Sequence, residues 1–396
     1  MTESKRVQII DGMRGFSLFG ILLANLLIFQ YGIWGKDEIE IYSLSAVDSA
    51  AYKFVKIAIE GSFMPIFTFL FGYSMVKMME SLKRNGVKVW RHCARRFLLL
   101  IAIGLLHSIF LWEGDILFFY GMMGFFLLLF LKRSKKTLLI WGTALLMLTF
   151  ALGYGVIEET VAEKEKMADY VDATKTIYVD GTYTEIMDQR NNEDPLIMPD
   201  YLYLFILLLS PFFTAPLFLY GMYAAKAGIF TRPDKEKPLY QKGALLVPIG
   251  LLLKSIPVLL PETNWTGVAG AIGTSALSIG YICAFPLLYI KWPTSKINIS
   301  FEQVGKLSLT NYLMQTIICT FIFYGYGLGL FGQLGVIASI LLGIMIFILQ
   351  CVCSTLYMKR FKRGPSEQLM RMWTNWSWSG RIRTKKPKPF DRVEGL

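Results

Sequence analysis

The chain has 396 residues, of which 54% are hydrophobic, 15% aromatic and only 18% charged, with a formal net charge of +12. Soluble domains contain about 25% charged residues, so this composition excludes an ordinary soluble domain. Apolar runs of about 20 residues, the length that crosses a bilayer, recur along nearly the whole chain and indicate an all-α polytopic membrane protein.

The apolar runs predict ten membrane-spanning helices. In chain order they cover roughly residues 14–34, 54–78, 95–112, 114–131, 137–157, 202–228, 243–260, 265–290, 305–326 and 333–357. Four parts follow: a five-helix N-terminal half (1–157), an acidic loop (158–200), a five-helix C-terminal half (201–358) and a basic tail (359–396).

The basic residues predict the orientation of these helices. Of the 41 Lys and Arg residues, 33 fall in segments that share one side of the membrane with the N-terminus. Because basic loops stay in the cytoplasm, we expect both termini in the cytoplasm. The five cysteines and two histidines have no metal-site spacing, so neither a metal nor a tightly bound cofactor is expected.

The loop 158–200 is expected on the opposite, outer side. It carries twelve acidic and four basic residues. We interpret it as a solvated cap, with a cation-attracting vestibule as the alternative. Its "YVDGTY" segment predicts a small hairpin.

Ionisable and amide side chains inside the predicted spans form two layers. Such groups are costly in a membrane and therefore mark candidate functional positions. The outer layer comprises Asn25, Lys56, Glu60, His107, Glu113, Asp115 and Lys254, and the inner layer comprises Asp11, Arg14, Arg95, Arg96 and Lys306. Eleven residues separate Arg14 from Asn25, which places them on one helix face about 16 Å apart, and Arg96 has the same spacing to His107.

Structural roles are the alternative for these residues. His107 is expected in either a functional or a purely hydrogen-bonded role, and Lys56 can reach the outer interface with Glu60 as its salt-bridge partner. Asp115 and Glu113 suit the N-terminus of the fourth span, where a carboxylate favours the helix dipole. The two adjacent arginines of the third span can be positive-inside anchors.

Three pairs of segments predict an internal repeat. "FLFGYSMVK" is similar to "FLYGMYAAK", "IGLLHSI" to "IGLLLKSI", and "YGMMGFFLLLFLK" to "IGYICAFPLLYIK". Spans two to four would then match spans six to eight in the same orientation, as a parallel repeat. This alignment would put His107 and Lys254 in equivalent positions.

Five motifs together resemble the YeiB-like family of bacterial membrane proteins. They are "DGMRGFSLFGILLAN" (11–25), "EGSFMPIFTFLFG" (60–72), "GLLHSIFLWEGDILFFYGMMG" (104–124), "GKLSLTNYLMQT" (305–316) and "GPSEQLMRMW" (364–373). The wider superfamily looks like that of the lysosomal heparan-α-glucosaminide N-acetyltransferase, which the pattern from Arg14-Gly15 to Asn25 matches. That enzyme's catalytic histidine follows the asparagine in the next loop, whereas residues 26–53 here contain no histidine.

The resemblance implies transfer of an acyl group, in the first instance acetyl, from cytosolic acyl-CoA to an extracytoplasmic acceptor such as a cell-envelope sugar. A base or nucleophile and an oxyanion donor are then needed. The candidate catalytic residues are His107, Asp115, Glu113, Asn25 and Glu60. The candidates for CoA are Arg14, Arg95, Arg96, Lys306 and Asn311, and those for the acceptor are Lys254, Lys56, Gln315 and Tyr312.

Two other classes of function remain open. A transporter or flippase of a small or lipidic substrate would use the same polar layers, with His107, Glu60 and Asp115 carrying protons or cargo. A non-enzymatic scaffold would act through the tail 359–396, which suits anionic membrane lipid. Nothing indicates nucleic-acid binding, and the oligomeric state, a homodimer included, is left open.

Overall fold

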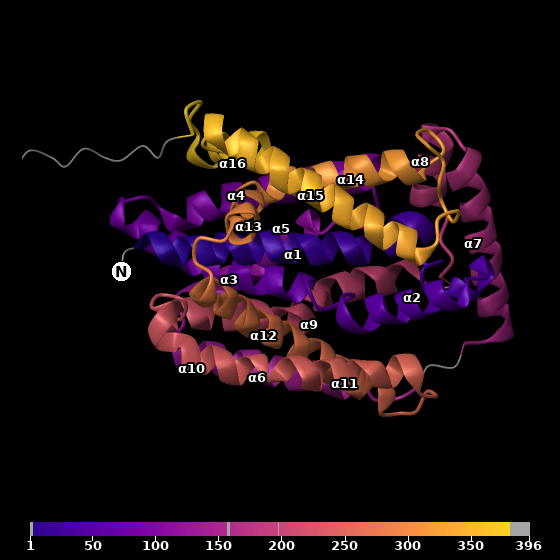
Figure 1. Cartoon of the computed structure of the whole chain (residues 1–396), viewed down its shortest axis with the longest axis horizontal. Coiled ribbons are helices and arrows are strands. Elements are labelled where there is room, and N and C mark those ends of the chain that lie inside the picture. Colours follow the sequence, from indigo (N-terminus) through magenta and orange to yellow (C-terminus); the bar gives the residue numbers. More distant parts are fainter. Residues whose placement is uncertain (1–2, 157–158, 197, 381–396) are drawn as a thin grey trace, which may run out of the picture.

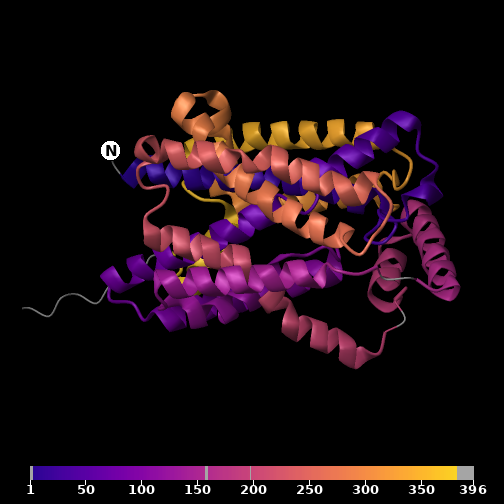
Figure 2. The ribbon, with the colours of Figure 1, turned by 90° about the horizontal axis from the view of Figure 1, so that it is seen from below.

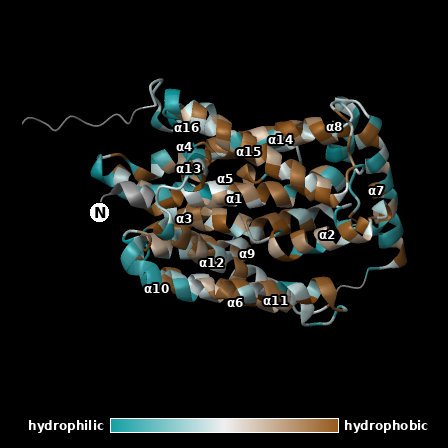
Figure 3. Cartoon of the chain, in the orientation of Figure 1, coloured by the Kyte–Doolittle hydropathy of each residue, from teal (hydrophilic) through white to brown (hydrophobic). Residues whose placement is uncertain are grey.

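The computed structural model describes residues 3–156, 159–196 and 198–380, and every regular element in this part of the chain is a helix. The helices lie lengthwise in one bundle whose middle is hydrophobic and whose two ends are more hydrophilic (Figures 1 and 3). The prediction of an all-α polytopic membrane protein is therefore confirmed.

Seven helical segments of the described chain are long and apolar enough to cross a membrane. They are Gln8–Tyr31 of α1 (Glu3–Tyr31), α4 (Val89–Phe110), α6 (Lys135–Leu152), Tyr201–Ala227 of α9 (Asp200–Ala227), Pro233–Leu259, α12 (Thr266–Lys291) and α15 (Val336–Arg360). The segment Pro233–Leu259 contains α10 (Pro233–Ala244) and α11 (Leu246–Leu259). The other three predicted spans coincide with helices outside this set, namely α3 (Met64–Arg84) and the shorter apolar helices α5 (Leu117–Leu131) and α14 (Ser308–Phe323).

The remaining helices lie at the two ends of the bundle. They are η1 (Ile39–Tyr42), α2 (Ala46–Ala58), α7 (Val161–Asp180), α8 (Tyr183–Asn192), α13 (Lys296–Lys306) and α16 (Pro365–Asn375). We call the end with the start of α1 and with α16 the basic end, and the end with α7 and α8 the far end. Figure 2 shows α7 running across the far end, transverse to the bundle.

Two predicted spans are interrupted. The span 54–78 consists of the end of α2, an irregular turn and α3, and the span 305–326 begins at the junction of α13 and α14. In the first break, Lys254 Nζ donates hydrogen bonds to the Glu60 carbonyl oxygen and to Ser62 Oγ. A buried lysine thus satisfies backbone that the helix break leaves unpaired.

The hairpin predicted at "YVDGTY" is wrong, because this segment joins the helices α7 and α8. Each helix begins with a capping box, formed by Thr160 with Glu163 and by Thr182 with Glu185. These boxes satisfy the free N–H groups of both first turns and so favour helices on either side of the turn.

The internal repeat has a structural counterpart where α3 crosses α9. A Cβ atom on Gly72 would collide with the carbonyl oxygen of Phe218, and one on Gly221 would collide with that of Phe69. The two glycines occupy the same position of the aligned "FLFG" and "FLYG" segments. A reciprocal contact of this kind is what a two-fold relation between matching halves produces.

The matching helix pairs α4–α5 and α11–α12 also pack alike. Gly104 lies against the backbone of Phe118, and Gly250 lies against that of the aligned Leu277. His107 and Lys254, which the alignment puts in equivalent positions, contact different elements, however. His107 faces α14, where it contacts Thr316, whereas Lys254 faces the break before α3.

The crossing at Gly72 gives a test of the fold. We expect Gly72→Ala to lower the free energy of unfolding by about 1–3 kcal/mol, because overpacking would force α3 and α9 apart. The matched control is Gly270→Ala in α12, where the nearest atom to a new Cβ is Pro257 Cγ at 3.3 Å. Thermal unfolding in detergent measures both, and equal stability of the two variants would contradict the proposed crossing.

Candidate functional site

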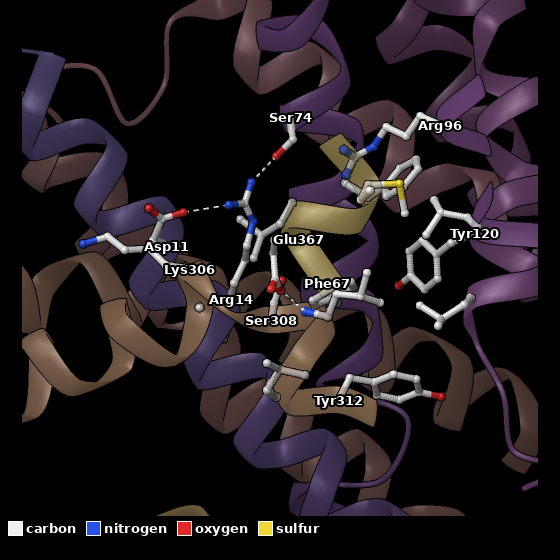
Figure 4. A pocket seen from close by; sticks show the side chains of 18 of the residues that line it. Asp11, Arg14, Phe67, Ser74, Arg96, Tyr120, Lys306, Ser308, Tyr312 and Glu367 are labelled. Atoms are coloured by element: carbon white, nitrogen blue, oxygen red, sulfur yellow. Dashed lines mark hydrogen bonds and ion pairs between the residues drawn. The ribbon is translucent and has the colours of Figure 1, made fainter. Parts of the chain in front are cut away.

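A cavity of about 480 Å³ opens at the basic end and extends into the bundle between α1, α3, α4, α5, α14 and α16 (Figure 4). Six cationic side chains line it: Arg14, Arg96, Lys306, Lys362, Arg363 and Arg371. The acidic lining residues are Asp11 and Glu367. The mouth of the cavity is therefore strongly cationic.

Backbone contact between α1 and α13 positions three of these charged residues. A Cβ on Gly15 would collide with the Phe301 carbonyl oxygen, and one on Gly305 would collide with that of Asp11. Only glycines permit this approach, which brings Lys306 beside the start of α1.

Arg14 is held in place by two partners. Its Nη1 donates to Asp11 Oδ1 at 2.6 Å, and its Nη2 donates to Ser74 Oγ at 2.6 Å. Arg96 lies on the other side of the cavity, nearer Tyr120 (Figure 4). Within the described residues its guanidinium has no hydrogen-bond or ion-pair partner, so its donors are available to a ligand.

The tail helix α16 forms part of the cavity wall, which the sequence did not predict. Glu367 accepts hydrogen bonds from the backbone N–H groups of Leu309 and Thr310, at 2.8 and 3.1 Å, and from Thr310 Oγ1 at 2.6 Å. A carboxylate is thereby placed at the N-terminus of α14, where it is favourable. This contact holds Arg371 at the cavity, and the signal for it was Glu367 within "GPSEQLMRMW".

Deeper in the bundle the lining becomes apolar and aromatic. Leu18, Phe67 and Leu100 follow the cations, and Ile116 and Tyr312 lie at the inner end. The Tyr312 ring stands 5.5 Å from the His107 ring, measured between centroids, and its hydroxyl accepts a hydrogen bond from Ile116 N at 3.3 Å. Tyr312 therefore separates the cavity from the histidine.

His107 lies between a carboxylate and a hydroxyl. Its Nδ1 is 3.0 Å from Asp115 Oδ1, and its Nε2 is 3.0 Å from Thr316 Oγ1. The side chains of His107 and Asp115 are 1% and 2% exposed. The other oxygen of Asp115 accepts a hydrogen bond from Phe118 N at 2.8 Å, so Asp115 caps the first turn of α5. Its Oδ1 lies close beside the imidazole, although the pair does not have the geometry of a hydrogen bond.

Known proteins match this chain over nearly its whole length. Protein YxaH of Bacillus subtilis, strain 168, is 34% identical over 392 residues, which cover 95% of this chain and 96% of that protein. This chain belongs to the YeiB-like family. Protein YeiB of Escherichia coli K12 is 23% identical over 92% of this chain and 95% of its own, and a 39.9 kDa protein in the amylase 3′ region of Bacillus acidopullulyticus is 24% identical over 93% and 94%. A family model described as "Protein of unknown function (DUF418)" matches residues 224–377, which include α14 and α16.

In this YeiB-like chain Glu113, one of the candidate catalytic residues, lies apart from His107 and contacts Arg190 instead. Its Oε2 lies 3.8 Å from Arg190 Nε on α8, and burial raises the pKa of the Glu113 carboxyl while Arg190 opposes the rise. Arg190 also donates to the carbonyl oxygens of Ile109 and Leu111, at 2.7 and 3.1 Å. Glu113 and Arg190 thus fasten α8 over the far end of α4.

The other outer candidates lie apart from the histidine as well. Lys56 contacts Glu60 at 2.9 Å and Asp37 at 2.6 Å, and Lys36 contacts the same two carboxylates at 2.9 and 2.6 Å. This alternating network ties α2 to the loop after α1, as the alternative structural interpretation of Lys56 and Glu60 predicted. Lys254 lies at the helix break before α3. Lys56, Glu60 and Lys254 are therefore all outside the cavity lining.

Asn311 and Gln315 form a buried polar contact between α14 and α15. Asn311 Nδ2 donates to Ser354 Oγ at 3.1 Å, and Gln315 Nε2 donates to Gln350 Oε1 at 2.9 Å. Neither residue lines the cavity, and the amide groups of both are engaged in this contact between helices.

Asn25 and Arg95 also fall outside the cavity lining. Asn25 is half-buried in α1, one turn before Phe29, whose ring stacks on Trp112 at 4.2 Å. The Arg95 guanidinium lies over the Trp376 ring at 5.2 Å, in a different pocket. Adjacent residues on a helix point about 100° apart, which is why Arg95 and Arg96 separate.

The contact between Glu367 of α16 and the start of α14 gives a second test. We expect Glu367→Ala to release α16 and to speed tryptic cleavage after Arg363 and Arg371 several-fold in detergent, because three donors at the start of α14 lose their acceptor. Glu80→Ala is the control, since Glu80 forms only a half-exposed surface pair with Lys77. Unchanged cleavage in Glu367→Ala would show that other contacts hold the tail.

Proposed function

We propose that this YeiB-like protein is a transmembrane acyltransferase. It takes an acyl group, in the first instance acetyl, from a CoA thioester at the basic end and passes it to an acceptor at the far end, such as a cell-envelope sugar. In this proposal the basic end faces the cytoplasm of a bacterial cell. The supporting observation is the order along one path: a cationic mouth, an apolar passage, then a buried histidine with its carboxylate.

The mouth suits the phosphates of CoA. Arginine guanidinium groups bind phosphate oxygens through two parallel hydrogen bonds, and a concentration of cations raises the local concentration of an anionic ligand. Arg96 has free donors for this purpose, and Arg14 is already oriented by Asp11 and Ser74. Lys362, Arg363 and Arg371 add charge from the tail side.

The passage suits the uncharged arm that carries the thioester. The whole cavity, mouth and passage together, has a volume of about 480 Å³, which lies within the usual range of about 300–1,000 Å³ for small-molecule pockets. Leu18, Phe67 and Leu100 give the passage an apolar lining, and Tyr312 stands where the arm would end.

His107 would act as the base. A carboxylate beside Nδ1 favours the tautomer that has its proton on Nδ1, which leaves Nε2 to accept a proton from the attacking hydroxyl or amine of the acceptor. The Thr316 hydroxyl occupies the hydrogen-bonding position of Nε2 in this structure. When the acceptor attacks the thioester carbonyl, its proton passes to Nε2 and the C–S bond breaks. The CoA thiolate leaves and takes up the proton from Nε2, which restores the neutral imidazole.

Binding of acetyl-CoA to detergent-purified protein tests the mouth without knowledge of the acceptor. We expect Arg96→Gln to weaken binding by about ten-fold or more, the usual loss for one charged hydrogen bond. His107→Ala should bind as the wild type does, and so should the control Arg232→Gln, an exposed arginine of the same end outside the cavity. No binding by folded wild type, or equal weakening by Arg232→Gln, would reject the proposed CoA site.

Acyl transfer itself tests the two neighbouring carboxylates. We measure acetyl groups on the cell envelope, by mass spectrometry, in a deletion strain complemented with each variant. His107→Ala and Asp115→Asn should lower transfer about 10²-fold or more, as expected on loss of a general base or of its orientation. Glu113→Gln should retain transfer within a few-fold, and full transfer by His107→Ala would exclude the histidine as base.

A transporter is the second candidate, favoured by the reciprocal packing of α3 and α9 at Gly72 and Gly221. Parallel repeats with polar groups at their interface are common in secondary transporters. Uptake or lipid flipping that requires a proton gradient, together with no acetyl-CoA binding, would favour this candidate over the acyltransferase.

A further inference from the structure

A second cationic pocket, of about 320 Å³, lies on the surface of the basic end. It is formed by the start of α4 and the end of α16, and its basic residues are Lys88, Arg91, His92 and Arg95. Nothing in the proposed acyl transfer uses it.

The pocket holds unbalanced positive charge. No acidic residue lines it, and within residues 3–156, 159–196 and 198–380 neither Lys88, Arg91 nor Arg95 has an ion-pair partner. Arg95 is instead positioned by α16: its guanidinium lies 5.2 Å from the centre of the Trp376 ring, and its carbonyl oxygen accepts a hydrogen bond from Trp373 Nε1 at 2.9 Å. These contacts fix a cation without neutralising it.

An apolar hollow of about 560 Å³ adjoins this pocket and shares Trp376 with it. The hollow is lined by Leu369, Met372, Trp373, Trp376, Ser377 and Trp378. Trp376 and Trp378 are 62% and 91% exposed, far more than is usual for such large apolar side chains. One ligand that fills both hollows needs an anionic group and an apolar portion.

The position along α4 indicates the environment of this ligand. Trp90 is exposed at the first turn of α4, and Leu98 and Leu105 are exposed farther along the same membrane-spanning helix. Tryptophans at the end of a spanning helix lie at the interface between headgroups and acyl chains. Basic pockets at that depth bind the phosphate groups of anionic lipids.

We propose that this pair of pockets is a binding site for one anionic phospholipid of the inner leaflet. The headgroup phosphate lies among Lys88, Arg91 and Arg95, and an acyl chain lies along Trp373, Trp376 and Trp378. Because Arg371 of the same helix lines the large cavity, the bound lipid also fixes the wall of that cavity. The site does not depend on the acyltransferase proposal.

The test is selective lipid retention by the full-length protein. Wild type, reconstituted in nanodiscs of equal parts phosphatidylglycerol and phosphatidylcholine, is extracted into detergent, and the retained lipid is quantified by native mass spectrometry. We expect one phosphatidylglycerol to be retained in preference to phosphatidylcholine. The double variant Arg91→Gln/Arg95→Gln should reduce that preference roughly thirty-fold, as expected for two cations at an anionic lipid surface.

The control is Lys235→Gln/Lys237→Gln, which removes the same charge from exposed positions of α10 at the same end. An equal loss of preference in this control would mean that the lipid is attracted only by net charge and would overturn the site. No preference in wild type would overturn it as well, because no anionic lipid would then be selected. Competition with adenosine 3′,5′-bisphosphate tests whether the pocket binds the phosphate of a nucleotide instead of that of a lipid headgroup. Displacement of the lipid by this nucleotide at micromolar concentration would assign the pocket to a nucleotide and overturn the proposal.

Discussion

The close crossing of α1 and α13 determines the geometry of the basic end. Gly15 and Gly305 let the two backbones touch, and no side chain can be accommodated at either position without moving a helix. Asp11 and Arg14 lie on one side of this contact, and Lys306 directly follows it. The cationic mouth therefore rests on a backbone contact between segments that are almost 300 residues apart in sequence.

A second constraint is the satisfaction of polar groups inside an apolar bundle. Each buried polar group without a partner costs free energy, and several of these groups are paired in matched sets. Lys254 donates a hydrogen bond to the Glu60 carbonyl oxygen at the helix break, and Asn311 of α14 donates one to Ser354 of α15. His107 with Asp115 differs from these sets because its neighbour Tyr312 also lines a cavity that opens at the basic end.

The tail connects the two candidate sites. Glu367 fastens α16 to the start of α14, which directs Arg371 toward the large cavity, while Trp376 contacts Arg95 on α4. One short helix thus lies between a ligand cavity and a surface pocket. A displacement of α16 would move Arg371 in the large cavity and the Trp376 ring that contacts Arg95 in the surface pocket. The proposed lipid site and the proposed acyl-CoA site therefore share one structural element.

The sequence alone determined the membrane-spanning helices, because a bilayer demands an apolar run of fixed length wherever the chain crosses it. It also identified His107 and Asp115 as candidate functional residues, because ionisable groups are rare in such apolar runs. It could not choose Asp115 over Glu113, which share one loop, nor Arg96 over Arg95, which are adjacent. Those choices depend on which way each side chain points once the helices have packed.

The tertiary structure alone decided the remaining features of the site. Lys362 and Arg371 belong to the basic tail, whose charge the sequence explained by membrane topology alone, so that charge carried no information about a place in the cavity. Glu367 stood in a recognisable motif, but its partners on α14 could not be predicted from it. Asn311 and Gln315 looked available because their partners, Ser354 and Gln350, lie on a helix about 40 residues later. Composition and periodicity describe each helix separately, whereas a site consists of contacts between helices, and only packing creates those contacts.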